Sequence, residues 1–302
     1  MRCRMCPREC GAERDRGQTG RCGVPLEFRI ARAALHVWEE PCISAGNGSG
    51  AVFFSGCPLH CVFCQNREIS NGTAGADISA QRLYEIFFEL KEQGASNINL
   101  VTPTHYALPL IPVLRRAKRD GLALPVVYNC GGYESLETLR ALEGLVDVYL
   151  PDLKYLDPET AWRYSGARDY PRIALEALRE MVRQRPYPVW DGDRLVRGIL
   201  VRHLVLPGRT EEARKVLGLL EEEYGSDILI SMMSQYTPMP GGKLPDELNR
   251  TLNADEYAQV LDMAGKRSEQ NIYTQQLGSA GESFIPPFDL TGVKVARAKR
   301  NA

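Results

Sequence analysis

From residue 50 onward, short apolar runs alternate with amphipathic stretches along the chain. Short apolar runs bounded by turn residues are typical of buried strands, and apolar residues at i, i+3, i+4 and i+7 are typical of helices. Leu83, Ile86, Phe87 and Leu90 have the helical spacing. The strands predicted in this way lie at 51–54, 97–101, 125–128, 147–150, 195–206, 228–230 and 272–273.

Capping residues mark where the predicted helices begin. Side chains of this kind accept hydrogen bonds from the free N–H groups of a first helical turn, and a proline is well tolerated directly after them. Residues 186–194 contain two prolines and an Asp-Gly-Asp run, which predicts a loop. The predicted N-cap residues are Ser79, Ser135, Asp157, Thr210 and Asn253.

The alternation of strands and helices predicts a parallel sheet with right-handed crossovers. Six strands follow one another from Val52, and the run at 272–273 adds a seventh, fewer than the eight of a closed barrel. We therefore predict an open, partial (β/α)6 barrel over 50–275. A cysteine-rich N-terminal segment and a connector (together 1–49) precede the barrel, and an irregular basic tail (276–302) follows it.

Composition and charge narrow the function classes. The 302 residues are 44% hydrophobic and 25% charged, as in soluble globular proteins, and the formal net charge is -1. Such a balance gives no general attraction to nucleic acid or to anionic membranes, so we expect neither as a partner. No stretch approaches the roughly 18 apolar residues of a membrane span. The N-terminus lacks an apolar signal-peptide core, which predicts a cytoplasmic protein.

Three of the nine cysteines follow the first predicted barrel strand at the spacing C-x3-C-x2-C: Cys57, Cys61 and Cys64. Without a secretion signal, such a group indicates metal ligands rather than disulfides. A cubane iron–sulfur cluster is normally held by four cysteines, so three would leave one iron open to a small chelating ligand. The alternatives are a zinc knuckle without its fourth ligand, or unrelated buried cysteines.

A second group of cysteines occupies the N-terminal segment, namely Cys3, Cys6, Cys10 and Cys22. The segment is rich in arginine and glycine and poor in large apolar residues, so it cannot form a core of its own. Four thiols can close a zinc site or hold an auxiliary iron–sulfur cluster, and either would staple the segment. Free thiols are the remaining alternative.

The phrase FFSGCPLHCVFCQN, residues 53–66, resembles the radical S-adenosylmethionine (radical SAM) superfamily, and in particular the pyruvate formate-lyase activating enzymes. The resemblance implies that Cys57, Cys61 and Cys64 hold a [4Fe-4S] cluster whose open iron binds SAM. It also implies one-electron cleavage of SAM to a 5′-deoxyadenosyl radical, which abstracts a hydrogen atom. Phe63 would lie near the adenine in such a site.

Further candidates stand where the other predicted strands end. The resemblance implies that Asp152 and Lys154 bind a cation and SAM, and that Arg202 contacts SAM. Gln235 or Tyr236 stands near the place of a histidine in the activating enzymes. Thr102 and Thr104 replace a Gly-Gly-Glu turn that binds the SAM amine. The remaining candidates are Asn129 for SAM, His105 as an acid or base or a loop histidine, and Cys42 and Cys130 as small buried residues.

Three functions follow from these residues. The first is a glycyl-radical activase, which abstracts hydrogen from a partner polypeptide and takes its electron from a donor such as flavodoxin or ferredoxin. The second is a radical SAM enzyme that modifies another peptide or a small molecule. The third is a non-catalytic iron–sulfur or zinc protein.

Overall fold

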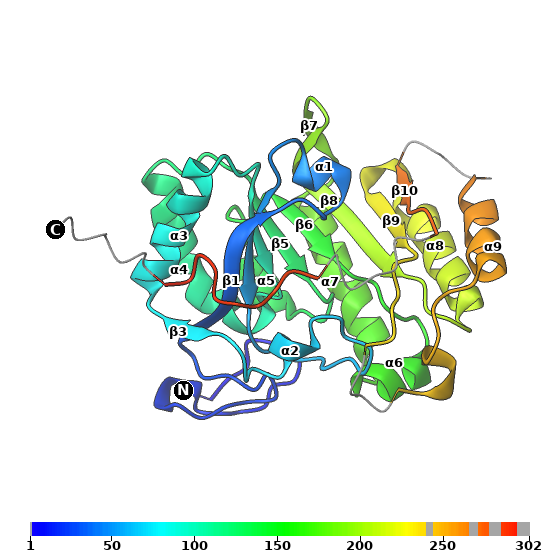
Figure 1. Cartoon of the computed structure of the whole chain (residues 1–302), viewed down its shortest axis with the longest axis horizontal. Coiled ribbons are helices and arrows are strands. Elements are labelled where there is room, and N and C mark those ends of the chain that lie inside the picture. Colours follow the sequence, from blue (N-terminus) through cyan, green and yellow to red (C-terminus); the bar gives the residue numbers. More distant parts are fainter. Residues whose placement is uncertain (1, 240–243, 266–270, 278–284, 295–302) are drawn as a thin grey trace.

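The computed structural model describes residues 2–239, 244–265, 271–277 and 285–294, and it contains one mixed sheet flanked by helices (Figure 1). Within these ranges the sheet has ten strands, with the order β10-β9-β8-β6-β5-β4-β2-β1-β3 and with β7 paired to β8. The parallel strands are β2 (Ser49–Phe54), β4 (Ile98–Val101), β5 (Val126–Cys130), β6 (Val148–Pro151), β8 (Arg194–Leu204), β9 (Leu229–Met233) and β10 (Ile272–Thr274).

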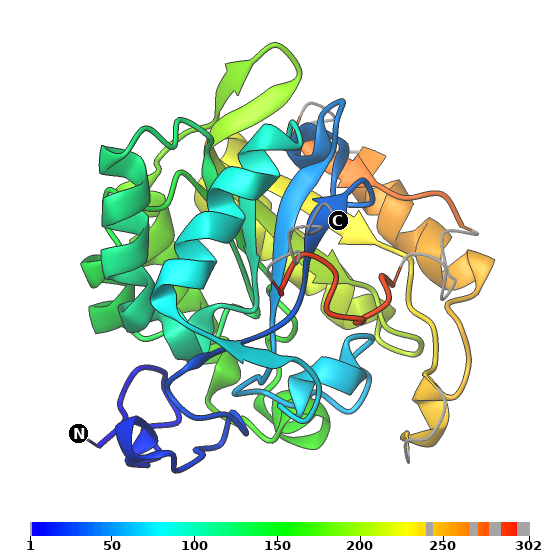
Figure 2. The ribbon, with the colours of Figure 1, turned by 60° about the vertical axis from the view of Figure 1, so that its left-hand side comes forward.

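Three strands run antiparallel to their neighbours: β1 (Phe28–His36), β3 (Ala76–Ile78) and β7 (Val189–Asp191). β1 comes from the connector and extends the sheet beyond β2. Near the C-terminus, Leu290 and Thr291 hydrogen-bond to Ala31 and Ala33 on β1, so the last described segment lies across this edge (Figure 2). In the part of the chain that the structure describes, the sheet does not close, which confirms the predicted open α/β barrel.

Helices between the parallel strands cover the outer face of the curved sheet, as right-handed crossovers require. Each buries one apolar stripe, for example Leu83, Ile86, Phe87 and Leu90 of α3. The longer helices are α3 (Ala80–Glu92), α4 (Ala107–Arg119), α5 (Leu136–Ala141), α6 (Pro158–Ser165), α7 (Tyr170–Gln184), α8 (Thr210–Tyr224) and α9 (Ala254–Gly265). None in the described ranges is long and apolar enough to cross a membrane.

The connector covers part of the inner face of the sheet. The short helix α1 (Pro41–Ser44) places Cys42 and Ile43 against Val127, Leu150 and Leu200, which point inward from β5, β6 and β8. Cys42 is therefore a buried apolar residue at 3% exposure, in agreement with its predicted role. A second short helix, α2 (Arg67–Ser70), follows the three-cysteine loop.

The predicted helix starts hold at three positions. Ser79 accepts a hydrogen bond from Arg82 N, Asp157 from Thr160 N, and Asn253 from Glu256 N. The prediction is wrong for Thr210, which is the first helical residue and not the cap. Ser135 precedes α5 without a side-chain cap.

One further prediction is wrong: residues 186–194 are not a loop throughout, because Val189–Asp191 forms β7. Gly192, with φ +59°, lets the chain reverse so that β7 pairs with the start of β8. The prolines that suggested a loop precede the paired residues, where the ladder needs no N–H donor. Of the predicted irregular tail, 276–302, the described residues 276–277 and 285–294 contain no helix or strand, and the rest lies outside the described residues.

Candidate active site

The three-cysteine loop begins where β2 ends, at one end of the molecule together with α2, α6 and the N-terminal segment (Figure 1). Gly56 has φ +90°, and its N–H donates to the Ile69 carbonyl. A Cβ at Gly56 would lie 2.6 Å from the Cys22 carbonyl oxygen, so only glycine lets the two segments approach this closely. His60, also at positive φ, contacts the Arg21 carbonyl through Nε2 at 2.6 Å.

The loop sulfurs have polar neighbours suited to thiolate ligands. The Leu59 N–H donates to Cys57 Sγ at 3.4 Å, and Cys61 Sγ lies 3.0 Å from Ser165 Oγ at the end of α6. Burial, followed by the neighbouring cysteines, raises the pKa of Cys57 to about 11 and of Cys64 to about 12. Without a metal, the Cys57 and Cys64 thiols are therefore protonated at neutral pH, and a metal has to displace these protons.

Charged and amide side chains gather at the ends of β5, β6 and β8. The parallel register of β6 and β8 continues as a bridge between Asp152 and Arg202, which places the two residues side by side. Arg202 Nε donates to Asp152 Oδ1 at 3.0 Å, and Arg202 Nη2 donates to Asn129 Oδ1 at 2.6 Å. Lys154 Nζ donates to the other Asp152 oxygen, Oδ2, at 2.6 Å. The structure thus brings four predicted SAM contacts into one group.

Lys154 connects this group to the cysteine loop. Burial opposes its charge, but Asp152 and the sulfurs of Cys61 and Cys64 outweigh burial and raise the Lys154 pKa. The ammonium is therefore charged at neutral pH and lies within electrostatic range of the sulfurs. A cation at this position suits both an anionic thiolate-bound cluster and a ligand carboxylate.

Glu39 also belongs to the site, although the sequence did not reveal it, and its side chain is only 8% exposed. Glu39 Oε1 accepts from Asn99 Nδ2 at 3.0 Å and Asn129 Nδ2 at 3.2 Å, and Oε2 accepts from Arg202 Nη1 at 3.4 Å. The connector thus supplies a carboxylate beneath the predicted SAM contacts. An acidic pair after an apolar strand is the only sequence signal, and it does not reveal the partners.

Glu40, the second residue of that pair, has a buried oxygen, Oε2, that has no hydrogen-bond partner among the described residues. The same holds for Asn99 Oδ1, which is also buried. Burial raises the Glu40 pKa to about 7. Glu40 Oε2 and Asn99 Oδ1 could therefore each accept a hydrogen bond from a bound ligand.

Other predicted contacts stand apart from the group. Thr102 has φ +59°, a strained conformation for a β-branched residue that is often found at functional sites. Thr104 is buried and donates to Glu134 Oε1 at 2.6 Å, so its hydroxyl is directed into the core. Phe63 packs among Tyr155, Tyr164 and Tyr236.

Gln235 lies at the end of β9 and outside the Arg202 group. Its Oε1 accepts from Gln275 Nε2 at 3.1 Å.

His105 is buried, with Nε2 2.8 Å from the Ser55 carbonyl, and burial lowers its pKa to about 3. His105 is thus neutral at physiological pH, and it contacts the backbone at Ser55, just before the three-cysteine loop. Cys130 is 2% exposed, and burial raises its pKa well above the usual value.

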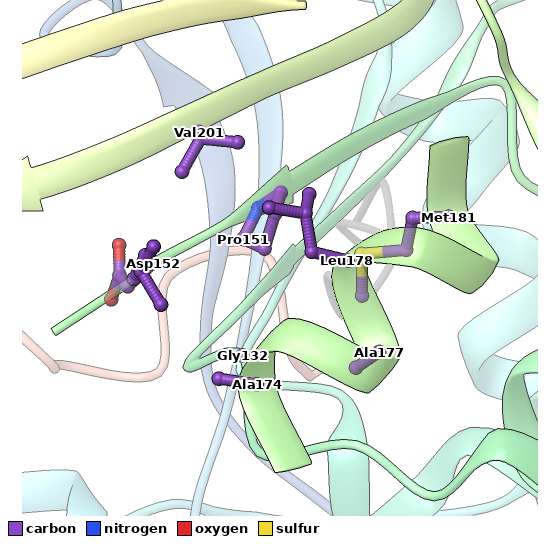
Figure 3. Close-up of a pocket in the computed structure, with 9 residues that line it drawn as sticks. Gly132, Pro151, Asp152, Ala174, Ala177, Leu178, Met181 and Val201 are labelled. Carbon is purple, nitrogen blue, oxygen red and sulfur yellow. The ribbon is translucent and has the colours of Figure 1, made fainter. Parts of the chain in front are cut away.

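A small space behind Asp152 belongs to the packing of the site. Its volume is about 10 Å³, room for about one water molecule, and it is too small for a cofactor. Figure 3 shows Pro151 and Val201 on one side and the α7 side chains on the other, with the Asp152 carboxylate apart from them. Gly132, at φ +78°, lies so close to the Asp152 carbonyl that no side chain fits.

The four N-terminal cysteines interact with one another. Burial raises the Cys6 pKa to about 12, and Cys22 and Cys3 add to this electrostatically. Burial also opposes ionisation of Cys10, but the N–H groups of Ala12 and Arg21 and the Cys3 side chain outweigh it and lower the Cys10 pKa. The four thiols are neighbours in space despite the sequence gap before Cys22.

Neither cysteine group encloses a metal position as it stands. Within the described residues, no three His, Cys, Asp or Glu side chains are already arranged to hold a metal ion. The donor set of the loop nevertheless fits an iron–sulfur cluster, because three thiols, a backbone N–H and an ammonium face one region. The assignment of the ligands remains a prediction.

Comparison with known proteins identifies the family. The model of the radical SAM superfamily matches residues 51–220, more than half of the 302 residues. The chain belongs to the radical SAM superfamily and is a radical SAM enzyme. The superfamily implies a [4Fe-4S] cluster and SAM as cofactors, in agreement with the sequence motif.

Named relatives refine the comparison. An uncharacterized protein of Methanocaldococcus jannaschii is 26% identical over 281 residues, covering 90% of this chain and 76% of that protein. The pyruvate formate-lyase-activating enzyme of Listeria monocytogenes is 25% identical over 180 residues, covering 56% of this chain and 67% of the enzyme. The crystal structure of Streptococcus suis SuiB superposes with a TM-score of 0.53 at 14% identity over 76% of this chain, which spans 49% of SuiB.

Proposed function

We propose that this enzyme abstracts a hydrogen atom from a partner polypeptide, in the manner of glycyl-radical activating enzymes. The observation that carries the proposal is the group of Asp152, Lys154, Arg202 and Asn129 beside the three-cysteine loop. The relative named as a pyruvate formate-lyase-activating enzyme supports the choice of a polypeptide target.

In this proposal Cys57, Cys61 and Cys64 hold the cluster. When bound, the cluster and SAM supply a 5′-deoxyadenosyl radical by one-electron cleavage of the sulfonium. Arg202 has five N–H donors, three of which bond to Asp152, Asn129 and Glu39, so two remain for the SAM carboxylate. The other SAM contacts that we propose are Phe63, Thr102, Asn129, Asp152, Lys154 and Gln235. The Thr104 hydroxyl donates to buried Glu134 instead, so the structure argues against its predicted contact with SAM.

A cleft of about 600 Å³ supports access for a polypeptide. It opens between the connector and the side chains after β9 and β10, and Trp38, Glu39, Gln235 and Gln275 line it. Trp38 is 60% exposed. Glu39 lies between this cleft and the Arg202 group, so a segment bound in the cleft would reach the predicted SAM contacts. An external carrier such as flavodoxin or ferredoxin would deliver the electron.

Anaerobic incubation of the reconstituted protein with dithionite and SAM tests the chemistry. We expect 5′-deoxyadenosine from the wild type and from Cys42→Ala, which changes a buried cysteine far from the loop, but none from Cys61→Ala. A wild type that forms no 5′-deoxyadenosine under these conditions refutes the assignment.

The target is tested separately by EPR after addition of a candidate glycyl radical enzyme. A glycyl doublet that depends on SAM and on Cys61 supports the activase. If 5′-deoxyadenosine forms but no candidate gives the doublet, the target is another peptide or a small molecule, the second function that the sequence indicates.

A further inference from the structure

The N-terminal segment contains little regular secondary structure and few buried apolar side chains. Residues 2–27, which precede β1, contain one short 3-10 turn, Arg14–Arg16, and no other helix or strand. Cys6, Cys22 and Val24 are the buried apolar side chains there, at 7%, 5% and 0% exposure. A loop of this length inside an ordered protein is normally fixed by a metal, by disulfides or by function.

The backbone of the N-terminal segment forms turns around its cysteines. Cys3 N donates to Ala12 O at 3.0 Å and Gly11 N donates to Cys3 O at 3.1 Å, which places Cys3 beside Cys10. These contacts close a first turn, residues 3–12, which contains Cys3, Cys6 and Cys10.

A second turn, residues 20–23, brings the chain back to the first turn. Gly23, with φ +81°, closes it by donating to Gly20 O at 3.0 Å, with Cys22 inside the turn. A Cβ at Gly20 would lie 2.5 Å from Cys10 Sγ, so the second turn packs directly on the sulfur of the first. Small residues at this point let Cys22 rejoin the other three thiols.

We propose that Cys3, Cys6, Cys10 and Cys22 bind one zinc ion, and that this ion fixes the segment that braces the three-cysteine loop. Four thiolates and no open position are the donor set of a structural zinc site. The sulfurs do not yet enclose an ion, so zinc draws them together as it binds, and its binding free energy contributes to folding of the N-terminal segment.

The brace consists first of backbone contacts between the two cysteine groups. Cys57 N donates to the Cys22 carbonyl at 3.2 Å, so one proposed zinc ligand is hydrogen-bonded to one proposed cluster ligand. His60 Nε2 lies 2.6 Å from the carbonyl of Arg21, the neighbour of Cys22. A displacement of the second N-terminal turn would therefore shift the loop at Cys57 and His60.

Arg8 supplies the other part of the brace. Its guanidinium donates to the Pro58 carbonyl at 2.9 Å, the Gly166 carbonyl at 2.6 Å and the Ser165 carbonyl at 2.9 Å. Pro58 follows Cys57, and Ser165 contacts Cys61, so Arg8 joins the loop to α6. Because Arg8 stands between Cys6 and Cys10, a zinc ion bound to these cysteines fixes its position.

Metal analysis tests the zinc site without any activity measurement. In the Cys57→Ala/Cys61→Ala/Cys64→Ala variant, we expect about one zinc per chain, because the four N-terminal ligands remain. Adding Cys10→Ser and Cys22→Ser should remove it. Absence of bound zinc overturns the proposal, and so does iron with sulfide in its place. Neither result depends on SAM cleavage, so failure here is distinct from failure of the proposed function.

A second experiment tests the brace on the reconstituted, otherwise wild-type protein. Arg8→Lys retains the charge but cannot hold three carbonyls in a fork. We expect it to keep zinc while losing cluster iron and broadening the EPR spectrum of the reduced cluster. Arg16→Lys, on an exposed side chain of the same segment, is the matched control. Removal of zinc with a chelator should reproduce the spectral change. An unchanged cluster spectrum after zinc removal overturns the bracing role.

Discussion

The substitution Arg202→Lys tests the proposed SAM site most directly. Arg202 is 16% exposed and donates to Asp152, Asn129 and Glu39, which fixes the plane of its guanidinium. Lysine retains the positive charge but offers one ammonium in place of a planar fork. It can keep the bond to Asp152 or reach a ligand carboxylate, but it cannot do both in the geometry of arginine.

The expected magnitude follows from the hydrogen bonds that are lost. A hydrogen bond to a charged group contributes about 1.5–3 kcal/mol, and the lysine variant loses at least one such bond to the SAM carboxylate. Since about 1.4 kcal/mol corresponds to a tenfold change in affinity, SAM should bind about 10- to 100-fold more weakly. The kcat for 5′-deoxyadenosine at saturating SAM should change less than KM.

The assay is the dissociation constant of SAM on the anaerobically reconstituted enzyme. Arg197→Lys is the matched control, because Arg197 lies on the same strand but is exposed. It should bind SAM as the wild type does. If Arg202→Lys also binds SAM within twofold of the wild type, while remaining folded, Arg202 does not contact SAM and the proposed site is misplaced.

Three further predictions concern stability and are measured by urea unfolding. Burial raises the Glu134 pKa to about 7, so the native state holds this proton more tightly than the unfolded chain. The resulting stabilisation is fully present below about pH 4.5, and about 3 kcal/mol is lost as pH rises from there through 7. Glu134→Gln should remove this slope, and an unchanged slope contradicts the assignment. Gly132 and Gly144 both have positive φ, but only Gly132 meets the Asp152 carbonyl. Gly144→Ala should cost about 1–2 kcal/mol, whereas Gly132→Ala should cost at least about 1 kcal/mol more; equal losses contradict the close-approach argument. Asp157→Ala removes the cap of α6 and should cost about 1 kcal/mol, and a loss near zero means that the cap does not stabilise α6.

The positions of Asp152 and Arg202 show how much of the site the local sequence pattern can predict. Both stand at the ends of apolar strands, so the alternation of strands and helices is enough to place them at one edge of a parallel sheet. Their direct pairing depends on the register of β6 and β8, which the pattern does not specify. The sequence predicts the edge of the sheet at which a residue lies, because the run of apolar residues that marks a strand, and therefore the strand's end, can be recognised locally.

Glu39 shows what local pattern leaves out. It hydrogen-bonds to Arg202 across 163 positions of the chain, and no periodicity in the connector encodes that partner. Arg8 likewise reaches Ser165 across 157 positions. The three-cysteine loop and the alternating elements were determined by the sequence itself, because both depend on short spacings. The carboxylate beneath the site and the N-terminal segment packed against the loop were decided only by tertiary structure, since contacts between distant segments form when the whole sheet brings them together.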